Sequence, residues 1–203
     1  MIIHGFIRGC VMQTMCSQIR IGGLLFFLAL MLGLVNNAFA DGGTSWVPKR
    51  QEVVHLAFTD GSSYDLKLFP DVDGVFLDGN KHEINGESYI SVFQVSPSNP
   101  GSPTKYCGAG SEVWLYVYKV SGAELKVQTR VLVSSCLRSL SMDWLDGDVQ
   151  QDNADFSAVQ WNEEGFSIRW LYNVDNSERS ISSTIYVLRN KVFSAQNILS
   201  EER

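Results

Sequence analysis

Apolar and polar side chains alternate with a period of two over much of the chain beyond residue 50. Tyr64, Leu66 and Leu68, for example, are separated by charged neighbours. Successive side chains of a strand point to opposite faces, so this alternation predicts strands that are apolar on one face. No stretch beyond residue 50 keeps a helical period for more than about two turns. The pattern therefore predicts an all-β fold.

Turn signals divide these runs into hairpins. Residues 59–62, Asn85-Gly86 and Ser121-Gly122 each lie between two apolar runs, and such sequences are typical of tight β-turns. About nine or ten short strands at this spacing predict an antiparallel sandwich or barrel, built from hairpins and a C-terminal meander. The expected strands are 51–58, 64–69, 72–77, 82–84, 87–95, 112–120, 124–134, 156–161, 166–172 and 180–188. Residues 194–203 are expected to form a helical turn or a frayed end.

The hairpin of residues 112–134 permits a prediction of register. If Ser121 and Gly122 form its loop, the aromatic residues of the first strand oppose mostly apolar residues of the second. The expected pairs are Trp114 with Thr129, Tyr116 with Val127, and Tyr118 with Leu125. Opposed residues share a face, so we expect these aromatic residues to form a core face rather than a sugar or peptide platform.

The first 40 residues differ from the rest of the chain. Arg8 and Arg20 precede an uncharged apolar run, residues 21–35, which is followed by Ala38-Phe39-Ala40. This order predicts a secretory signal peptide, 1–40, with cleavage before Asp41 and no membrane span afterwards. An uncleaved anchor is the alternative, because residues 21–40 carry no charge and are just long enough to cross a bilayer. In both cases residues 41–203 are expected to form a single exported all-β domain, in the periplasm or outside the cell.

Cysteine usage agrees with export. Of the four cysteines, Cys10 and Cys16 lie in the predicted leader, which leaves Cys107 and Cys136. An even pair in an exported domain predicts a disulfide bond. The chain has no Asn-x-Ser/Thr glycosylation site, which favours a bacterial envelope over a eukaryotic secretory route.

The charge of the chain is acidic. Arg8 and Arg20 are the only charged residues before position 41, so the net charge of −6 for the whole chain becomes −8 for residues 41–203. A basic nucleic-acid-binding surface is therefore not expected. A cationic protein partner is the kind of partner that such a charge would attract.

The segment 141–155 concentrates this charge. Its acidic and aromatic residues are Asp143, Trp144, Asp146, Asp148, Asp152 and Asp155, and it contains no basic residue. One interpretation is a solvated loop. A second is a contact surface for a cationic protein, in which Trp144 anchors and the aspartates steer the partner. A third is a calcium site at Asp146 and Asp148, although the spacing of an EF-hand loop is absent.

Motifs of known catalytic chemistry are missing from the sequence. It has no nucleophile elbow, no phosphate-binding glycine loop and no His-Glu-x-x-His metal motif. We therefore predict no catalytic residues, no cofactor and no metal site beyond the weak calcium alternative, and we incline against an enzyme.

Export, acidity and the disulfide together predict a binding module. This layout resembles that of small periplasmic inhibitor and immunity proteins, which neutralise cationic hydrolases or toxins; the resemblance concerns layout and no shared motif. The leading hypothesis is an inhibitor or immunity protein that blocks a cationic envelope hydrolase or toxin. The alternatives are a secreted carboxylate-dependent hydrolase acting on glycans and a structural or assembly factor of the envelope.

Overall fold

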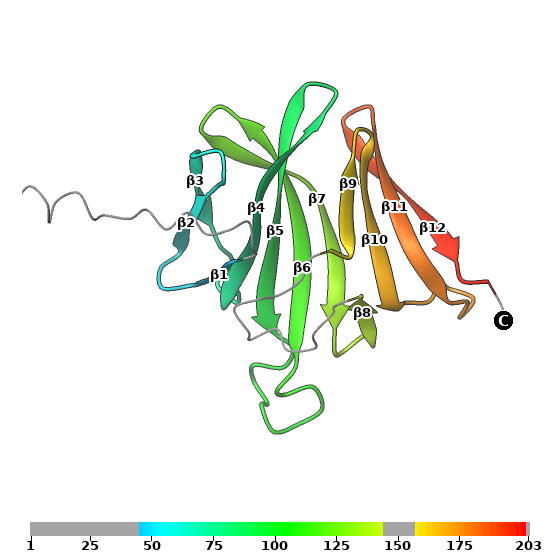
Figure 1. The fold of residues 1–203 in the computed structure, drawn as a ribbon. Helices are drawn as coiled ribbons and strands as arrows, with labels where there is room; N and C mark the ends of the chain where they lie inside the picture. Colours follow the sequence, from blue (N-terminus) through cyan, green and yellow to red (C-terminus); the bar gives the residue numbers. More distant parts are fainter. Residues whose placement is uncertain (1–44, 144–156, 202–203) are drawn as a thin grey trace, which may run out of the picture. The chain divides into compact units, whose positions relative to one another are not determined.

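The computed structural model describes residues 45–143 and 157–201, which fall within one compact unit, Ala40–Arg203. All regular structure in this part of the chain is β-strand (Figure 1). The strands are β1 (Ser45–Pro48), β2 (Val53–Ala57), β3 (Ser63–Lys67), β4 (Gly74–Ile84), β5 (Glu87–Pro97), β6 (Ser111–Ser121), β7 (Glu124–Ser135), β8 (Leu140–Met142), β9 (Val159–Asn162), β10 (Gly165–Tyr172), β11 (Ile181–Arg189) and β12 (Val192–Leu199). None of the described residues belongs to a helix capable of crossing a membrane.

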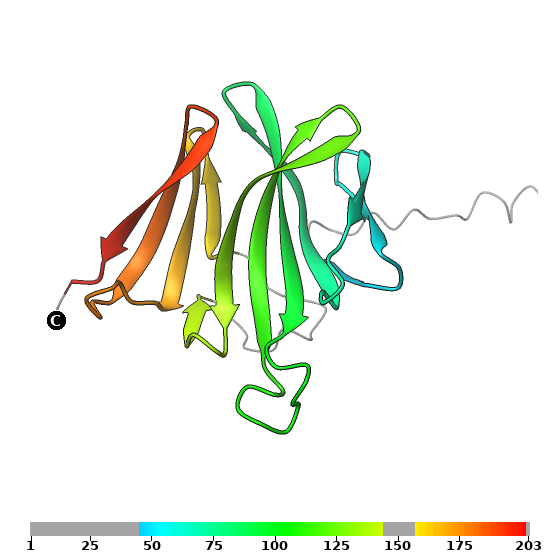
Figure 2. The same ribbon diagram turned by 180° about the vertical axis from the view of Figure 1, so that it is seen from behind.

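Ten strands form one antiparallel sheet, in the order β1-β4-β5-β6-β7-β8-β10-β11-β12, with β9 paired to β10. β2 and β3 form a separate hairpin. Figures 1 and 2 show β4–β7 and β9–β12 as two groups of strands, which the short strand β8 connects. β1 and β12 lie at the two ends of the strand order and do not pair with each other, so the sheet stays open among the described residues. The predicted all-β antiparallel fold is confirmed, and its two parts pack as layers rather than closing into a barrel.

The layers enclose an inner core. It contains buried residues from both groups of strands, among them Phe76, Phe93, Leu115, Phe166 and Ile168, all fully buried. Phe166 lies among three other rings, with centroid distances of 5.0 Å to Trp161, 4.6 Å to Tyr186 and 5.3 Å to Phe193. These contacts join β10 to β9, β11 and β12. One side chain therefore contacts all the other strands of the second layer, which consists of β9–β12.

A second, outer core lies on the opposite face of β4–β6. There the β2–β3 hairpin buries Leu56 and Leu66 against Val92, Tyr116 and Tyr118. The strands β5 and β6 are therefore buried on both faces. This differs from the prediction of a single apolar face for residues 112–120: Val113, Leu115 and Val117 point into the inner core while Tyr116 and Tyr118 point into the outer one.

The predicted register of β6 and β7 is wrong. The turn consists of Gly122 and Ala123, because Ser121 pairs with Glu124, and two bulges shift the register further along the hairpin. Trp114 consequently pairs with Leu132 and Tyr116 with Arg130. The turn lies one residue later than predicted, which already shifts the pairs nearest to it. Each bulge then adds one unpaired residue to one strand, and the sequence pattern did not show where.

Two other elements differ from the prediction. The expected strands 72–77 and 82–84 form one strand, β4, whose register shifts between Leu77 and Lys81. Thr59 donates its backbone N–H to the carbonyl of Gly79 in this interruption, at 2.9 Å. Of the residues 194–203 expected to be helical or frayed, 194–199 belong to β12, which pairs with β11, and 202–203 lie outside the described residues. Its turn, Asn190-Lys191, has positive φ at both residues but no glycine, so the usual hairpin signal is missing.

The turn of the β2–β3 hairpin contains a carboxylate, Asp60, whose contacts make the stability of the fold depend on pH in the acid range. Asp60 accepts hydrogen bonds from the hydroxyl and the backbone N–H of Ser62, at 2.6 and 2.9 Å, and pairs with Lys81 at 3.0 Å. These contacts, with the Ser62 hydroxyl first, lower the pKa of Asp60 from 3.8 to about 2.

A carboxyl group with a lowered folded-state pKa stabilises the fold above its unfolded pKa and loses this contribution as the pH falls through its folded pKa. We therefore expect Asp60→Asn to flatten the decline in stability between pH 3.8 and about 2, as measured by urea unfolding at pH values across this window. Ser62→Ala should flatten this decline only in part, because it removes the hydroxyl donor to Asp60 and keeps the backbone N–H donor. An acid profile of Asp60→Asn that matches the wild type would contradict the assignment.

Candidate functional site

A loop of 13 residues, 98–110, connects β5 to β6. Figure 1 shows it projecting beyond the ends of both strands. Unstructured connections of this length are uncommon in compact domains and are often functional. We call residues 98–110 the braced loop, because several contacts hold it to the body of the domain.

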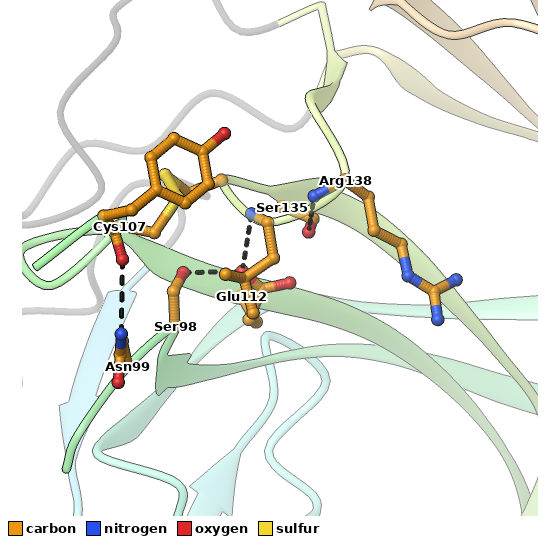
Figure 3. Close-up of a disulfide and its surroundings, with 9 residues drawn as sticks. Ser98, Asn99, Cys107, Glu112, Ser135 and Arg138 are labelled. Carbon is orange, nitrogen blue, oxygen red and sulfur yellow. Dashed lines mark hydrogen bonds between the residues drawn. A yellow bond between two sulfur atoms is a disulfide. The ribbon is translucent and has the colours of Figure 1, made fainter. Parts of the chain in front are cut away.

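The disulfide Cys107–Cys136 joins the braced loop to the turn after β7, with the two Cα atoms 5.7 Å apart. The predicted disulfide is thus present. Beside it, Ser98 donates its hydroxyl to Glu112 at 2.5 Å, and the backbone N–H of Leu137 donates to the same carboxylate oxygen at 3.4 Å (Figure 3). Glu112 therefore connects the start of the loop to the turn that the disulfide also reaches.

The loop also has its own internal order. The backbone N–H of Gly108 donates to the carbonyl of Lys105 at 2.8 Å. The side-chain amide of Asn99, labelled in Figure 3, donates to the carbonyl of Tyr106 at 3.3 Å. A Cβ atom at Gly108 would lie 2.1 Å from the carbonyl oxygen of Pro103, so the close approach of the chain requires glycine there. These local contacts, together with the disulfide, preorganise the loop.

Two apolar residues and two cations next to the disulfide-bonded cysteines in sequence are exposed. The side chain of Tyr106 is 72% exposed and that of Leu137 is 51% exposed. Lys105 and Arg138, both exposed, lie within two residues of Cys107 and Cys136. An exposed tyrosine and an exposed leucine, each next to one cysteine of the same disulfide and each followed or preceded by a cation, are residue types suited to contact with another macromolecule.

The acidic segment is only partly described by the structure. Asp143 lies directly after β8, donates its backbone N–H to the carbonyl of Arg169 at 3.0 Å and pairs with its guanidinium at 3.3 Å. Its charge is therefore already partnered within the domain. The other residues predicted to bind a partner or calcium lie outside the described residues, so their roles stay predictions: Trp144, Asp146, Asp148, Asp152 and Asp155.

Titratable groups form no obvious reaction centre in the described part of the chain. No group of three or more His, Cys, Asp or Glu residues is placed to hold a metal ion among residues 45–143 and 157–201. His82 lies 3.0 Å from Asp78 and stacks on Trp161, with ring centroids 4.2 Å apart. The indole of Trp161 donates to the hydroxyl of Ser91 at 3.1 Å. This arrangement links the two layers.

Comparison with protein families, curated proteins and solved structures finds no match to this chain. Any assignment of function therefore rests on the geometry of its own residues. In the sequence, residues 96–105 carry Pro97, Pro100 and Pro103, a composition typical of an irregular segment. This range overlaps the braced loop only in part, because β5 continues to Pro97. The exposure of Tyr106 depends on how the loop folds, and the disulfide brings the segment of Leu137 to the braced loop. Local sequence shows neither.

Proposed function

We propose that this protein is an exported, non-catalytic binding module that holds a protein partner through the braced loop. The observation that carries the proposal is Tyr106, an exposed aromatic residue that directly precedes a disulfide-bonded cysteine. An inhibitor or immunity protein of the cell envelope is the most concrete version of this function.

Preorganisation is the physical reason for favouring this loop. Binding costs free energy when flexible side chains and loops must be ordered, and a loop that is already ordered avoids much of that cost. Tyrosine is also among the residues that most often dominate binding energy, because it buries a large area with few rotatable bonds. A rigid loop with an exposed tyrosine therefore supports specific binding better than a mobile one.

The charges indicate what kind of surface the partner has. Lys105 and Arg138 favour acidic groups opposite the braced loop. The net charge of residues 41–203 favours a cationic partner at long range, as does the acidic segment. A partner that is cationic overall, with acidic groups at the contact with the loop, satisfies both.

Replacement of Tyr106 by alanine tests the proposal. The partner is first isolated by cross-linking in the native envelope, identified by mass spectrometry and purified, and its affinity is then measured by calorimetry. We expect Tyr106→Ala to weaken binding by about 2 kcal/mol, roughly thirtyfold in Kd, with an unchanged melting temperature.

The matched control is Tyr172→Ala, because Tyr172 is also an exposed tyrosine, at 55%, but lies on β10. This variant is expected to bind like the wild type. Equal affinities of wild type and Tyr106→Ala would show that the partner does not use the braced loop.

A further inference from the structure

A cleft of about 240 Å³ lies beside the β2–β3 hairpin, on the outer face of the sheet. Strands β5, β6 and β7 and the segment after β3 contribute its walls, and none of its lining residues belongs to the braced loop. The residues that matter for its chemistry are Phe69, Asp71, Gln94, Trp114, Tyr116 and Arg130.

Gln94 is the unusual member of this set. Its side chain is only 2% exposed, and its amide nitrogen donates to the hydroxyl of Tyr118 at 2.9 Å. Its amide oxygen has no hydrogen-bond partner within the described residues. Exchanging the nitrogen and oxygen positions would leave the nitrogen unpaired instead, so one end of the amide lacks a partner in either orientation. A buried polar atom without a partner destabilises a fold. The amide oxygen of Gln94 also has almost no accessible surface, so a sugar hydroxyl reaches it only when the side chains that cover it move aside.

Aromatic rings supply the apolar part of the cleft. Phe69 is 53% exposed, and its ring centroid lies 6.3 Å from that of Tyr116. The guanidinium of Arg130 lies 5.2 Å from the centroid of the Trp114 ring, which fixes a cation beside the aromatic surface. Asp71, also exposed, adds a carboxylate. The cleft thus combines an accessible ring with hydrogen-bond acceptors and a donor.

We propose that this cleft binds a single pyranose ring of a glycan. Its volume lies below the range of about 300–1,000 Å³ typical of drug-sized ligands, so it suits one ring rather than a larger molecule. Sugar hydroxyls donate to the Gln94 amide and the Asp71 carboxylate and accept from the Arg130 guanidinium, while the C–H face of the ring packs on Phe69.

A peptide fits this location less well. Extended peptides commonly bind by adding a strand to the edge of a sheet, where backbone groups are free. The cleft lies on the face of β5–β7, whose backbone groups already pair with neighbouring strands. Side chains are therefore the groups available for recognition, and their mixture of donors, acceptors and rings matches a polyhydroxylated ring.

The inference is tested by titrating the ¹⁵N-labelled protein with N-acetylglucosamine and with the methyl α-pyranosides of glucose, mannose and galactose. At least one sugar should shift the side-chain amide signals of Gln94 and the indole signal of Trp114. Phe69→Ala should weaken this binding at least tenfold without unfolding the protein, since Phe69 is half exposed. Leu171→Ala, which removes an exposed leucine 69% accessible on β10, should leave it unchanged.

A second variant separates binding from folding. Gln94→Leu combined with Tyr118→Phe removes both members of the buried hydrogen bond and also the unpaired atom, so the protein should fold with at least wild-type stability and lose sugar binding. No shift with any of the four sugars, or shifts with N-acetylated amino-acid amides alone, would overturn the inference. Tyr106→Ala should retain sugar binding, so this test is independent of the proposed protein partner.

Discussion

Replacement of Phe166 by alanine is expected to lower the free energy of unfolding by about 3–5 kcal/mol. Phe166 is fully buried and packs against Trp161, Tyr186 and Phe193. Truncation removes apolar contacts on all three sides and leaves a cavity, because the neighbouring rings belong to paired strands and cannot easily collapse into it. Urea unfolding followed by tryptophan fluorescence measures the change.

Two variants control this result. Phe166→Leu should cost clearly less, because most of the apolar volume remains. Leu171→Ala, on the same strand but 69% exposed, should change stability by no more than about 0.5 kcal/mol. Similar losses for Phe166→Ala and Leu171→Ala would show that the second layer does not depend on the inner core for its stability.

Removal of the disulfide by Cys107→Ala with Cys136→Ala is expected to destabilise the domain by about 3–4 kcal/mol. The two cysteines are separated by 29 positions in the sequence, and opening this loop increases the entropy of the unfolded chain. The hairpin of β6 and β7 lies inside the loop, so residual structure in the unfolded state would reduce the loss. Thermal unfolding of the wild type with and without reductant gives a parallel measurement.

The same double variant should also weaken partner binding, even at temperatures where the domain is folded. Ser98, Glu112 and Leu137 remain to hold the base of the braced loop, but the covalent link beside Tyr106 is lost. We expect slower association and faster dissociation, because the loop must be ordered on binding. Unchanged affinity in a folded double variant would show that the disulfide does not contribute to partner binding and that its role is purely structural.

The two proposed sites share one structural origin. β5 and β6 are buried on both faces, by the second layer on one side and by the β2–β3 hairpin on the other. The hairpin covers the outer face incompletely, and the cleft lined by Gln94 and Trp114 lies where this cover ends. The braced loop extends from the ends of the same two strands. Rigid, doubly buried strands thus support both sites.

Local pattern predicted most of the strands. The alternation around Tyr64 and Leu66, and the turn at Asn85-Gly86, correspond to observed strands and to a turn with positive φ at both residues. The pairing of Cys107 with Cys136 followed from their number. The short strands β1 and β8 were missed because three or four residues carry too little periodicity to register, and β12 was missed because its turn lacks glycine.

The sequence by itself determined that the chain forms antiparallel hairpins, because side-chain alternation and turn residues are local properties. It also predicts a leader at residues 1–40, export, and a contact role for the segment 141–155; the leader and residues 144–155 lie outside the described residues. Only the tertiary structure decided which faces of the strands are buried. In an apolar strand the sequence does not distinguish Trp114 and Tyr116 from Val117, which faces the other core, because both faces of the strand are covered by other segments. The tertiary structure also decided that Gln94 is buried and half-satisfied and that Tyr106 is exposed on a braced loop, because burial and hydrogen-bond partners arise from segments distant in the sequence.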